Sequence, residues 1–229
     1  MPCFLSGIVA AHAFAANGNL PVEEFSHQDG HVMAALYSSG ASEKLLKAPF
    51  AAFHVSGGTT EVLYVTPRQD GFDVLQIGGT ADLNAGQAID RAGVMMGLQF
   101  PCGKEMEGLA SCFEGTLPSV RVSVKERTCN LSGLQNLAEK YFRETQDKAF
   151  VSAYVFEFIG KTLEQMTAQA DSIYSDIPIV YAGGVMGNRA LQERLGKRAN
   201  TYFAHPLFSA DNAAGVALLC RQRHLQQTN

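Results

Sequence analysis

The sequence predicts an α/β protein built on a mixed sheet, and two local patterns carry that prediction. Strand-like runs at Pro49–Val55 and Glu61–Thr66 flank Ser56–Thr60, an arrangement typical of a tight antiparallel hairpin. Later in the 229-residue chain, the apolar run Ile177–Ala182 leads directly into Gly183-Gly184 and a helical segment. Antiparallel strands followed by strand–glycine–helix units indicate a mixed sheet in an α/β fold.

The elements before the hairpin are predicted from capping and turn residues. The Ala-rich segment Leu5–Ala16 is expected to be a helix ended by Asn17-Gly18-Asn19, a C-cap signal. Val22–Phe25 is predicted to be a short strand. It leads into a helix over His27–Tyr37, which is expected to end near Gly40.

The elements after the hairpin are predicted from hydrophobic periodicity and glycine stops. A helical pattern from Leu134 to Ile173 is expected to break around Glu144–Gln146. The other predicted elements are the strands Val74–Ile77, Val120–Val124 and Thr201–Phe203 and the helices Asn84–Gly97, Lys104–Phe113, Asn188–Lys197 and Asp211–Leu225.

Composition and charge exclude several classes of protein. The net charge of −4 argues against an autonomous nucleic-acid binder, because phosphate contacts need clustered Lys and Arg; a nucleic-acid substrate delivered with a basic partner stays open. The longest apolar stretch, Cys3–Ala16, is expected to be neither a signal peptide nor a membrane span. Five scattered cysteines without a C-x-x-C pair predict a cytoplasmic protein with no disulfide framework.

His27 and His31 are the strongest chemical signal in the chain. On a helix, residues at i and i+4 lie on one face, so both imidazoles can reach one divalent metal. In metalloproteases with the H-E-x-x-H motif, the residue after the first histidine is a glutamate that acts as general base. Here that residue is Gln28, which excludes peptide hydrolysis but leaves a metal site possible.

Glycine-rich turns at Ser56–Thr60 and Gly183–Asn188 are candidate phosphate loops, because glycine lets backbone N–H groups approach a ligand closely. Each also has a plain alternative, a hairpin turn for the first and an ordinary strand-to-helix turn for the second. Asp90 could bind ribose hydroxyls or be a surface acid, and Asp211 could be a helix N-cap. A basic cluster could help to hold a nucleic acid or form a solvated helix face; it consists of Arg189, Arg194, Lys197 and Arg198, with Arg221 and Arg223.

Taken in order, the motifs resemble the Gcp/TsaD family of tRNA threonylcarbamoyladenosine synthases. The resemblance runs from about residue 2 to residue 219. The residues that carry it are His27-x-x-x-His31, His54–Thr60, Gly79–Asp90, Phe100–Gly103, Leu131–Leu134, Gly183–Asn188 and Asp211–Ala214.

The resemblance implies an actin/Hsp70-like fold of two lobes, the first incomplete at its N-terminus. Residues 1–48 with 209–229 would be the remnant of the first lobe, and residues 49–208 the second lobe. The implied reaction is transfer of a threonylcarbamoyl group from its adenylate to N6 of adenosine 37 in tRNA. The implied partners are tRNA and either family-type partner proteins or a second copy in a homodimer.

The resemblance also assigns site residues. His27, His31 and Asp211 would bind one divalent metal, Fe or Zn. The implied nucleotide is threonylcarbamoyl-AMP or ATP. Its phosphate and acyl group would face Val55, Ser56, Gly57 and Gly58, next to Thr59; its ribose would face Asp90 and Gly103; and its adenine would face Asn188 in the Gly183-Gly184 loop.

The sequence departs from the family pattern at two places. Thr59 stands where better-known members have histidine, and the family's leading strand–turn–strand, with its first phosphate loop, has no counterpart here. Two hypotheses therefore stay open. One is a metal-assisted acyltransferase; the other is a non-catalytic paralogue that acts as a nucleotide-binding scaffold or partner subunit.

Overall fold

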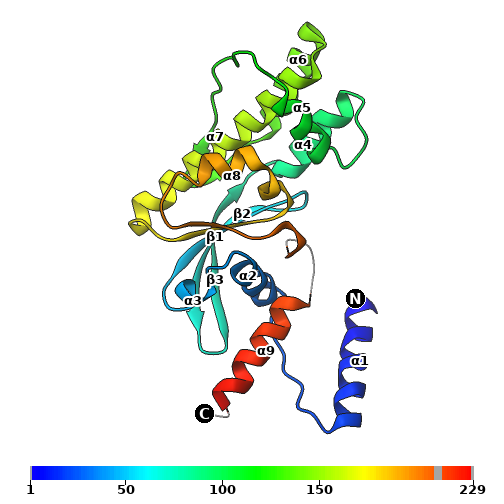
Figure 1. The fold of residues 1–229 in the computed structure, drawn as a ribbon, viewed down its shortest axis with the longest axis vertical. Coiled ribbons are helices and arrows are strands. Elements are labelled where there is room, and N and C mark those ends of the chain that lie inside the picture. Colours follow the sequence, from blue (N-terminus) through cyan, green and yellow to red (C-terminus); the bar gives the residue numbers. More distant parts are fainter. Residues whose placement is uncertain (1, 209–212, 228–229) are drawn as a thin grey trace.

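The computed structural model describes residues 2–208 and 213–227, which contain a seven-stranded mixed sheet (Figure 1). Its order is β4-β5-β3-β2-β1-β6-β7. β1, β2 and β3 form an antiparallel meander, while β6 and β7 run parallel to β1. The predicted mixed sheet is confirmed. The strands are β1 (Phe50–Val55), β2 (Thr60–Arg68), β3 (Gly71–Thr80), β4 (Val124–Lys125), β5 (Thr128–Cys129), β6 (Ile179–Ala182) and β7 (Thr201–Phe203).

Helices cover both faces of this sheet, and the alternation of side chains along β1 shows how. Phe50 and Ala52 pack into the core beneath α2 (His27–Ser38), α3 (Ser42–Leu45) and α9 (Ala214–Gln227). Ala51 and Phe53 pack into a larger core on the opposite face. That core is covered by α4 (Ala85–Met95), α5 (Gly103–Ser111), α6 (Ser132–Thr145), α7 (Lys148–Tyr174) and α8 (Arg189–Leu195).

The predicted N-terminal helix is confirmed as α1 (Pro2–Gly18), which extends away from the sheet (Figure 1). Its apolar side chains from Leu5 to Phe14 are exposed, Phe14 at 81%. Within the described ranges, none of the helices combines the length and the apolar composition that crossing a membrane requires.

The strand predicted at Val22–Phe25 is wrong, because this segment forms neither helix nor strand and pairs with none of the strands that the structure describes. Side chains attach it to α9 instead. The Arg223 guanidinium pairs with the Glu23 carboxylate at 2.5 Å and lies over the Phe25 ring at 4.2 Å.

The helix break predicted around Glu144–Gln146 is confirmed. Gln146 is left-handed, with a φ of 51°, and the Asp147 carboxylate caps α7 by accepting from the N–H groups of Ala149 and Phe150. The strand predicted over Val120–Val124 is mostly wrong, since only its last residue belongs to β4.

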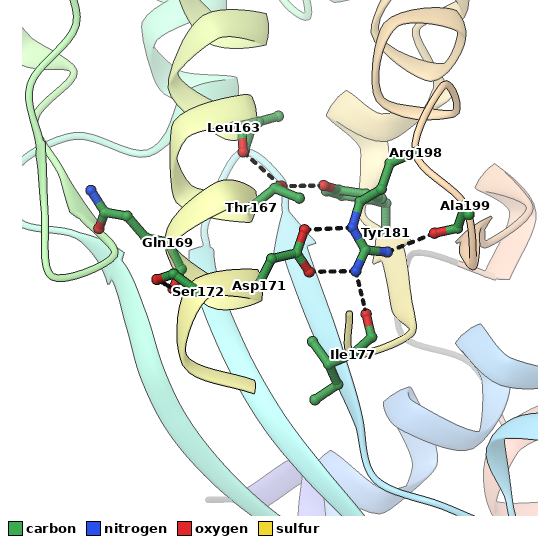
Figure 2. A network of polar contacts seen from close by, with 9 residues as sticks. All are labelled: Leu163, Thr167, Gln169, Asp171, Ser172, Ile177, Tyr181, Arg198 and Ala199. Atoms are coloured by element: carbon green, nitrogen blue, oxygen red, sulfur yellow. Dashed lines mark hydrogen bonds and ion pairs between the residues drawn. The ribbon is translucent and has the colours of Figure 1, made fainter. Parts of the chain in front are cut away.

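The start of β6 is fixed by a polar network between α7 and the segment after α8 (Figure 2). The Arg198 guanidinium pairs with the Asp171 carboxylate and donates to the Ile177 carbonyl at 2.7 Å. Farther along β6, the Tyr181 hydroxyl bonds the Thr167 hydroxyl, and burial raises the pKa of Tyr181. The network holds β6, and therefore the glycine loop that follows it, against the long helix α7.

Candidate functional site

The helix that carries the two histidines begins at a complete capping box. The Ser26 hydroxyl accepts from the Asp29 N–H at 3.0 Å, and the Asp29 carboxylate accepts from the Ser26 N–H at 3.4 Å. The same carboxylate accepts from the Phe72 N–H of β3 at 3.1 Å. Asp29 thus starts α2 at His27 and also ties the helix to the sheet.

His27 and His31 converge as their spacing predicts. Their Nε2 atoms lie 3.0 Å apart, and the rings meet edge to face. Both line a cavity of about 480 Å³ between α2 and the β1–β2 hairpin. Other residues of its lining include Ser56, Thr59, Glu61 and His54.

Asp211, the third predicted metal ligand, lies outside the described residues. Among the residues that are described, no three His, Cys, Asp or Glu side chains come close enough together to hold one ion. The start of α9 is nevertheless close to the histidines. A Cβ on Gly215 would lie 1.8 Å from the Gly30 carbonyl oxygen, so the backbones of α9 and α2 touch directly beside His31.

The Ser56–Thr59 turn is a hairpin held by its own serine. The Ser56 hydroxyl accepts from the N–H groups of Gly58 at 3.3 Å and Thr59 at 3.1 Å. A Cβ on Gly57 or Gly58 would meet nothing within 4 Å, and neither glycine has a positive φ. Contacts within the protein therefore give no reason for glycine at these two positions, whereas a closely bound ligand would.

The second glycine loop begins next to the first. Gly183 has a φ of 104°, and a Cβ there would lie 2.1 Å from the Val55 carbonyl oxygen, so this glycine is required by the fold itself. Gly184, at the start of the 3₁₀ turn η1 (Gly184–Gly187), faces open space. The N-terminus of α4 contacts the first glycine loop, since the Gly86 N–H donates to the Ser56 carbonyl at 3.0 Å.

The structure brings Asp90 and Gly103 together, the two residues expected at the ribose. The Asp90 carboxylate accepts from the Cys102 N–H at 2.8 Å, and Cys102 immediately precedes Gly103. A Cβ on Gly103 would meet nothing within 4 Å. Asp90 therefore holds the start of α5 and also lines a second cavity of about 430 Å³.

Asn188, expected on the adenine side, is buried and acts as the N-cap of α8. Its Oδ1 accepts from the Leu191 N–H at 3.0 Å. Arg189, the next residue, donates its backbone N–H to the Glu107 carboxylate of α5 at 2.8 Å. The loop after β6 is thereby joined to α5, the helix that begins at Gly103.

Part of the basic cluster is ion-paired within the fold. Arg194 pairs with Glu157 at 2.6 Å and Glu164 at 2.7 Å, and Arg198 pairs with Asp171. These pairs favour the interpretation as a structural helix face over a tRNA-binding surface.

His54, the first residue of the motif His54–Thr60, and Glu61 also line the cavity, although neither had a predicted role. The His54 ring centre lies 5.9 Å from that of His31, and its Nδ1 lies 3.7 Å from the Glu61 carboxylate. The alternation of side chains along a strand could have indicated where His54 lies, because His54 follows Phe50 and Ala52 at every second residue and these two face α2.

Asp82 belongs to the quoted motifs but had no predicted role, and the structure gives it one. Its carboxylate accepts from the Leu131 N–H at 2.8 Å, the Ser132 hydroxyl at 2.6 Å and the Leu83 N–H at 2.6 Å. Desolvation raises the pKa of Asp82, but these hydrogen bonds outweigh it and leave the pKa well below its ordinary value. Asp82 joins the loop before α4 to the start of α6.

The fold is shared with solved structures of larger proteins. Full-length HypF in the phosphate- and nucleotide-bound form aligns with a TM-score of 0.63 and 13% identity, over 90% of this chain and 43% of that one. The activator of the 2-hydroxyisocaproyl-CoA dehydratase from Clostridium difficile with bound ADPNP aligns with a TM-score of 0.54 and 14% identity, over 90% and 70%. The expected actin/Hsp70-like α/β class is confirmed.

Sequence comparison defines the family within that class. The family model TsaD, tRNA N6-adenosine threonylcarbamoyltransferase, matches residues 1–218. Proteins of that name from Ligilactobacillus salivarius (strain UCC118) and Streptococcus uberis (strain ATCC BAA-854 / 0140J) are 32% and 33% identical over 93% of this chain. The chain therefore belongs to the tRNA N6-adenosine threonylcarbamoyltransferase family. It spans 64% of the length of each of these relatives.

Replacing Asp82 with asparagine is expected to lower the free energy of unfolding at neutral pH by about 1 kcal/mol, because an amide oxygen accepts more weakly than a carboxylate. The pKa of Asp82 is lower in the folded state than in the unfolded state. The stabilisation by its ionised carboxylate is therefore fully present above the unfolded-state pKa of about 4 and is lost as the pH falls from there towards the folded-state pKa. Urea unfolding of Asp82→Asn and wild type should therefore converge at acid pH. A gap that stays constant from neutral to acid pH, or an equal effect of Glu114→Gln at an exposed carboxylate, would contradict this account.

Proposed function

We propose that this chain transfers a threonylcarbamoyl group from threonylcarbamoyl-adenylate to N6 of adenosine 37 in tRNA, assisted by one divalent metal. Family membership supports the reaction class. The observation that carries the proposal is the cavity in which the converging pair His27 and His31 faces the open glycine hairpin at Ser56–Thr59. A scaffold that only bound nucleotide would not need the two imidazoles.

The metal proposal rests on the chemistry of the donor set. Two imidazole nitrogens 3.0 Å apart suit a borderline ion, and with the carboxylate of Asp211 they would form a site of two histidines and one carboxylate. Such a set fits Fe or Zn and leaves coordination positions open. When bound, the metal would supply Lewis-acid polarisation of the acyl carbonyl.

The proposed nucleotide site includes glycines that no contact within the protein requires. The Ser56–Gly58 segment, next to the N-terminus of α4, would face the phosphate, with the Gly57 N–H as donor, because the Gly58 N–H already donates to the Ser56 hydroxyl. The Asp90–Gly103 pair would hold the ribose, and the Gly183–Asn188 loop would lie on the adenine side. Since the side-chain Oδ1 of Asn188 caps α8, the NH₂ of the same side chain is the group that would meet the base.

The chemical step is an acyl transfer. The N6 nitrogen of the acceptor adenosine attacks the carbamoyl carbon, a C–N bond forms, and the C–O bond to the adenylate phosphate breaks. AMP leaves with the bonding electron pair, and the N6 nitrogen loses a proton. The loop amide of Gly57 would stabilise the negative charge on the departing phosphate.

We also propose that tRNA is held together with a partner protein or with a second copy of the chain, because the net charge is −4 and Arg194 and Arg198 are already ion-paired. The division into 1–48 with 209–229 and 49–208 stays a prediction. So does the cytoplasmic location, which rests on the cysteine pattern.

Replacing His27 or His31 with alanine is expected to remove the bound metal. Metal analysis of purified wild type should find about one equivalent of Fe or Zn, and each variant should retain less than about a tenth of it. His12→Ala, at an exposed histidine of α1, is the matched control and should keep the full equivalent. Equal metal content in wild type and His27→Ala would remove the metal from the mechanism.

Replacing Gly58 with valine is expected to leave the fold intact and block the phosphate site, because the new side chain enters open space beside the loop. AMP affinity measured by calorimetry should fall by about tenfold or more, and mass spectrometry should find no transfer from threonylcarbamoyl-adenylate to unmodified tRNA. Gly133→Val, at an open position in the first turn of α6, should change neither readout. If wild type binds AMP but gives no modified tRNA even in a cell extract that supplies partner proteins, the scaffold hypothesis replaces this proposal.

A further inference from the structure

His54 reaches the cavity because of its place on β1. Phe50 and Ala52 pack beneath α2, and His54 follows them on the same face of the strand. The His54 ring lies 5.9 Å from the His31 ring, centre to centre. The imidazole therefore forms part of the wall opposite the histidine pair.

The sheet register places a carboxylate beside this imidazole. His54 of β1 pairs directly with Glu61 of β2, and directly paired side chains lie close together on one face. The His54 Nδ1 lies 3.7 Å from the Glu61 carboxylate, and the side chains are 26% and 24% exposed. A carboxylate on the Nδ1 side favours the tautomer with its proton on Nδ1, which leaves Nε2 as a hydrogen-bond acceptor.

His54 lies near the histidine pair but on a different element, strand β1 rather than helix α2. Within the described part of the chain, no group of three side chains is placed to hold a metal ion, although His54 is among the residues searched. On the wall of the cavity, the His54 imidazole is placed to contact a molecule that occupies it.

We propose that His54 is a specificity-determining residue that accepts, at Nε2, a hydrogen bond from a hydroxyl or N–H group on the acyl part of a bound acyl-adenylate. Glu61 is its positioning residue. The inference rests on the proposed function, since it assumes that the acyl part of the adenylate enters this cavity. It adds a recognition group for the acyl part, distinct from the loops that would hold the phosphate and the ribose.

The test compares two probes on the metal-loaded chain: AMP, and a sulfamate analogue of threonylcarbamoyl-adenylate that cannot be hydrolysed. His54→Ala should weaken binding of the analogue about tenfold and leave AMP affinity within twofold of wild type. His54→Gln, which restores an acceptor, should recover part of the loss. His12→Ala on α1 should change neither affinity.

A double-mutant cycle tests the role of Glu61. Glu61→Ala should weaken binding of the analogue in the same direction but less, and the double variant should be no weaker than His54→Ala alone. Additive losses would overturn the positioning role of Glu61.

Three further outcomes would overturn the proposal for His54. In the first, His54→Ala weakens AMP and the analogue equally. In the second, it loses the metal as His27→Ala does, which would make His54 a ligand. In the third, wild type prefers the analogue and His54→Ala keeps that preference. If wild type itself does not prefer the analogue to AMP, the proposed function fails, and this inference fails with it.

Discussion

The central strand β1 joins the antiparallel half of the sheet to the parallel half, and the candidate site is built at its carboxyl end. Its register with β2 forms the hairpin at Ser56–Thr59, and its register with β6 places Gly183 against the Val55 carbonyl. Its alternation sends Phe53 and Val55 into one core and Ala52 and His54 towards α2. A one-residue slip of β1 would exchange these two faces. His54 would then point away from α2, and the contact between Gly183 and the Val55 carbonyl would be lost.

The glycines divide into those that the fold requires and those that it leaves unexplained. Gly183 and Gly215 sit where a Cβ would collide with a neighbouring carbonyl, so packing alone demands them. Gly57, Gly58 and Gly103 face open space without a positive φ, and a larger side chain would cost the folded protein little. Open space alone does not mark a ligand contact, because Gly108 and Gly133 are equally open; the family resemblance is what selects Gly57, Gly58 and Gly103.

The sequence was most informative where the signal was local. The start of α2 and the break at Gln146 follow from capping and turn chemistry, and the family resemblance supplied the candidate site residues. Two expected strands, Val22–Phe25 and most of Val120–Val124, were wrong because a strand needs a neighbour, which no local pattern reveals. The role of Asp82 and the approach of His54 to His31 depend on contacts between residues far apart in the chain, so spacing could not predict them.

The central claim is that the His27–His31 pair and the Ser56–Thr59 hairpin serve one site. It is tested most directly by phosphorus NMR of AMP bound to the chain loaded with Mn²⁺ in one sample and Zn²⁺ in another. The account predicts faster phosphorus relaxation in the Mn²⁺ sample, because a paramagnetic ion on the histidines would lie close to the phosphate, and no such difference in His27→Ala. Equal relaxation in the two loaded samples, with AMP and metal both bound, would contradict it.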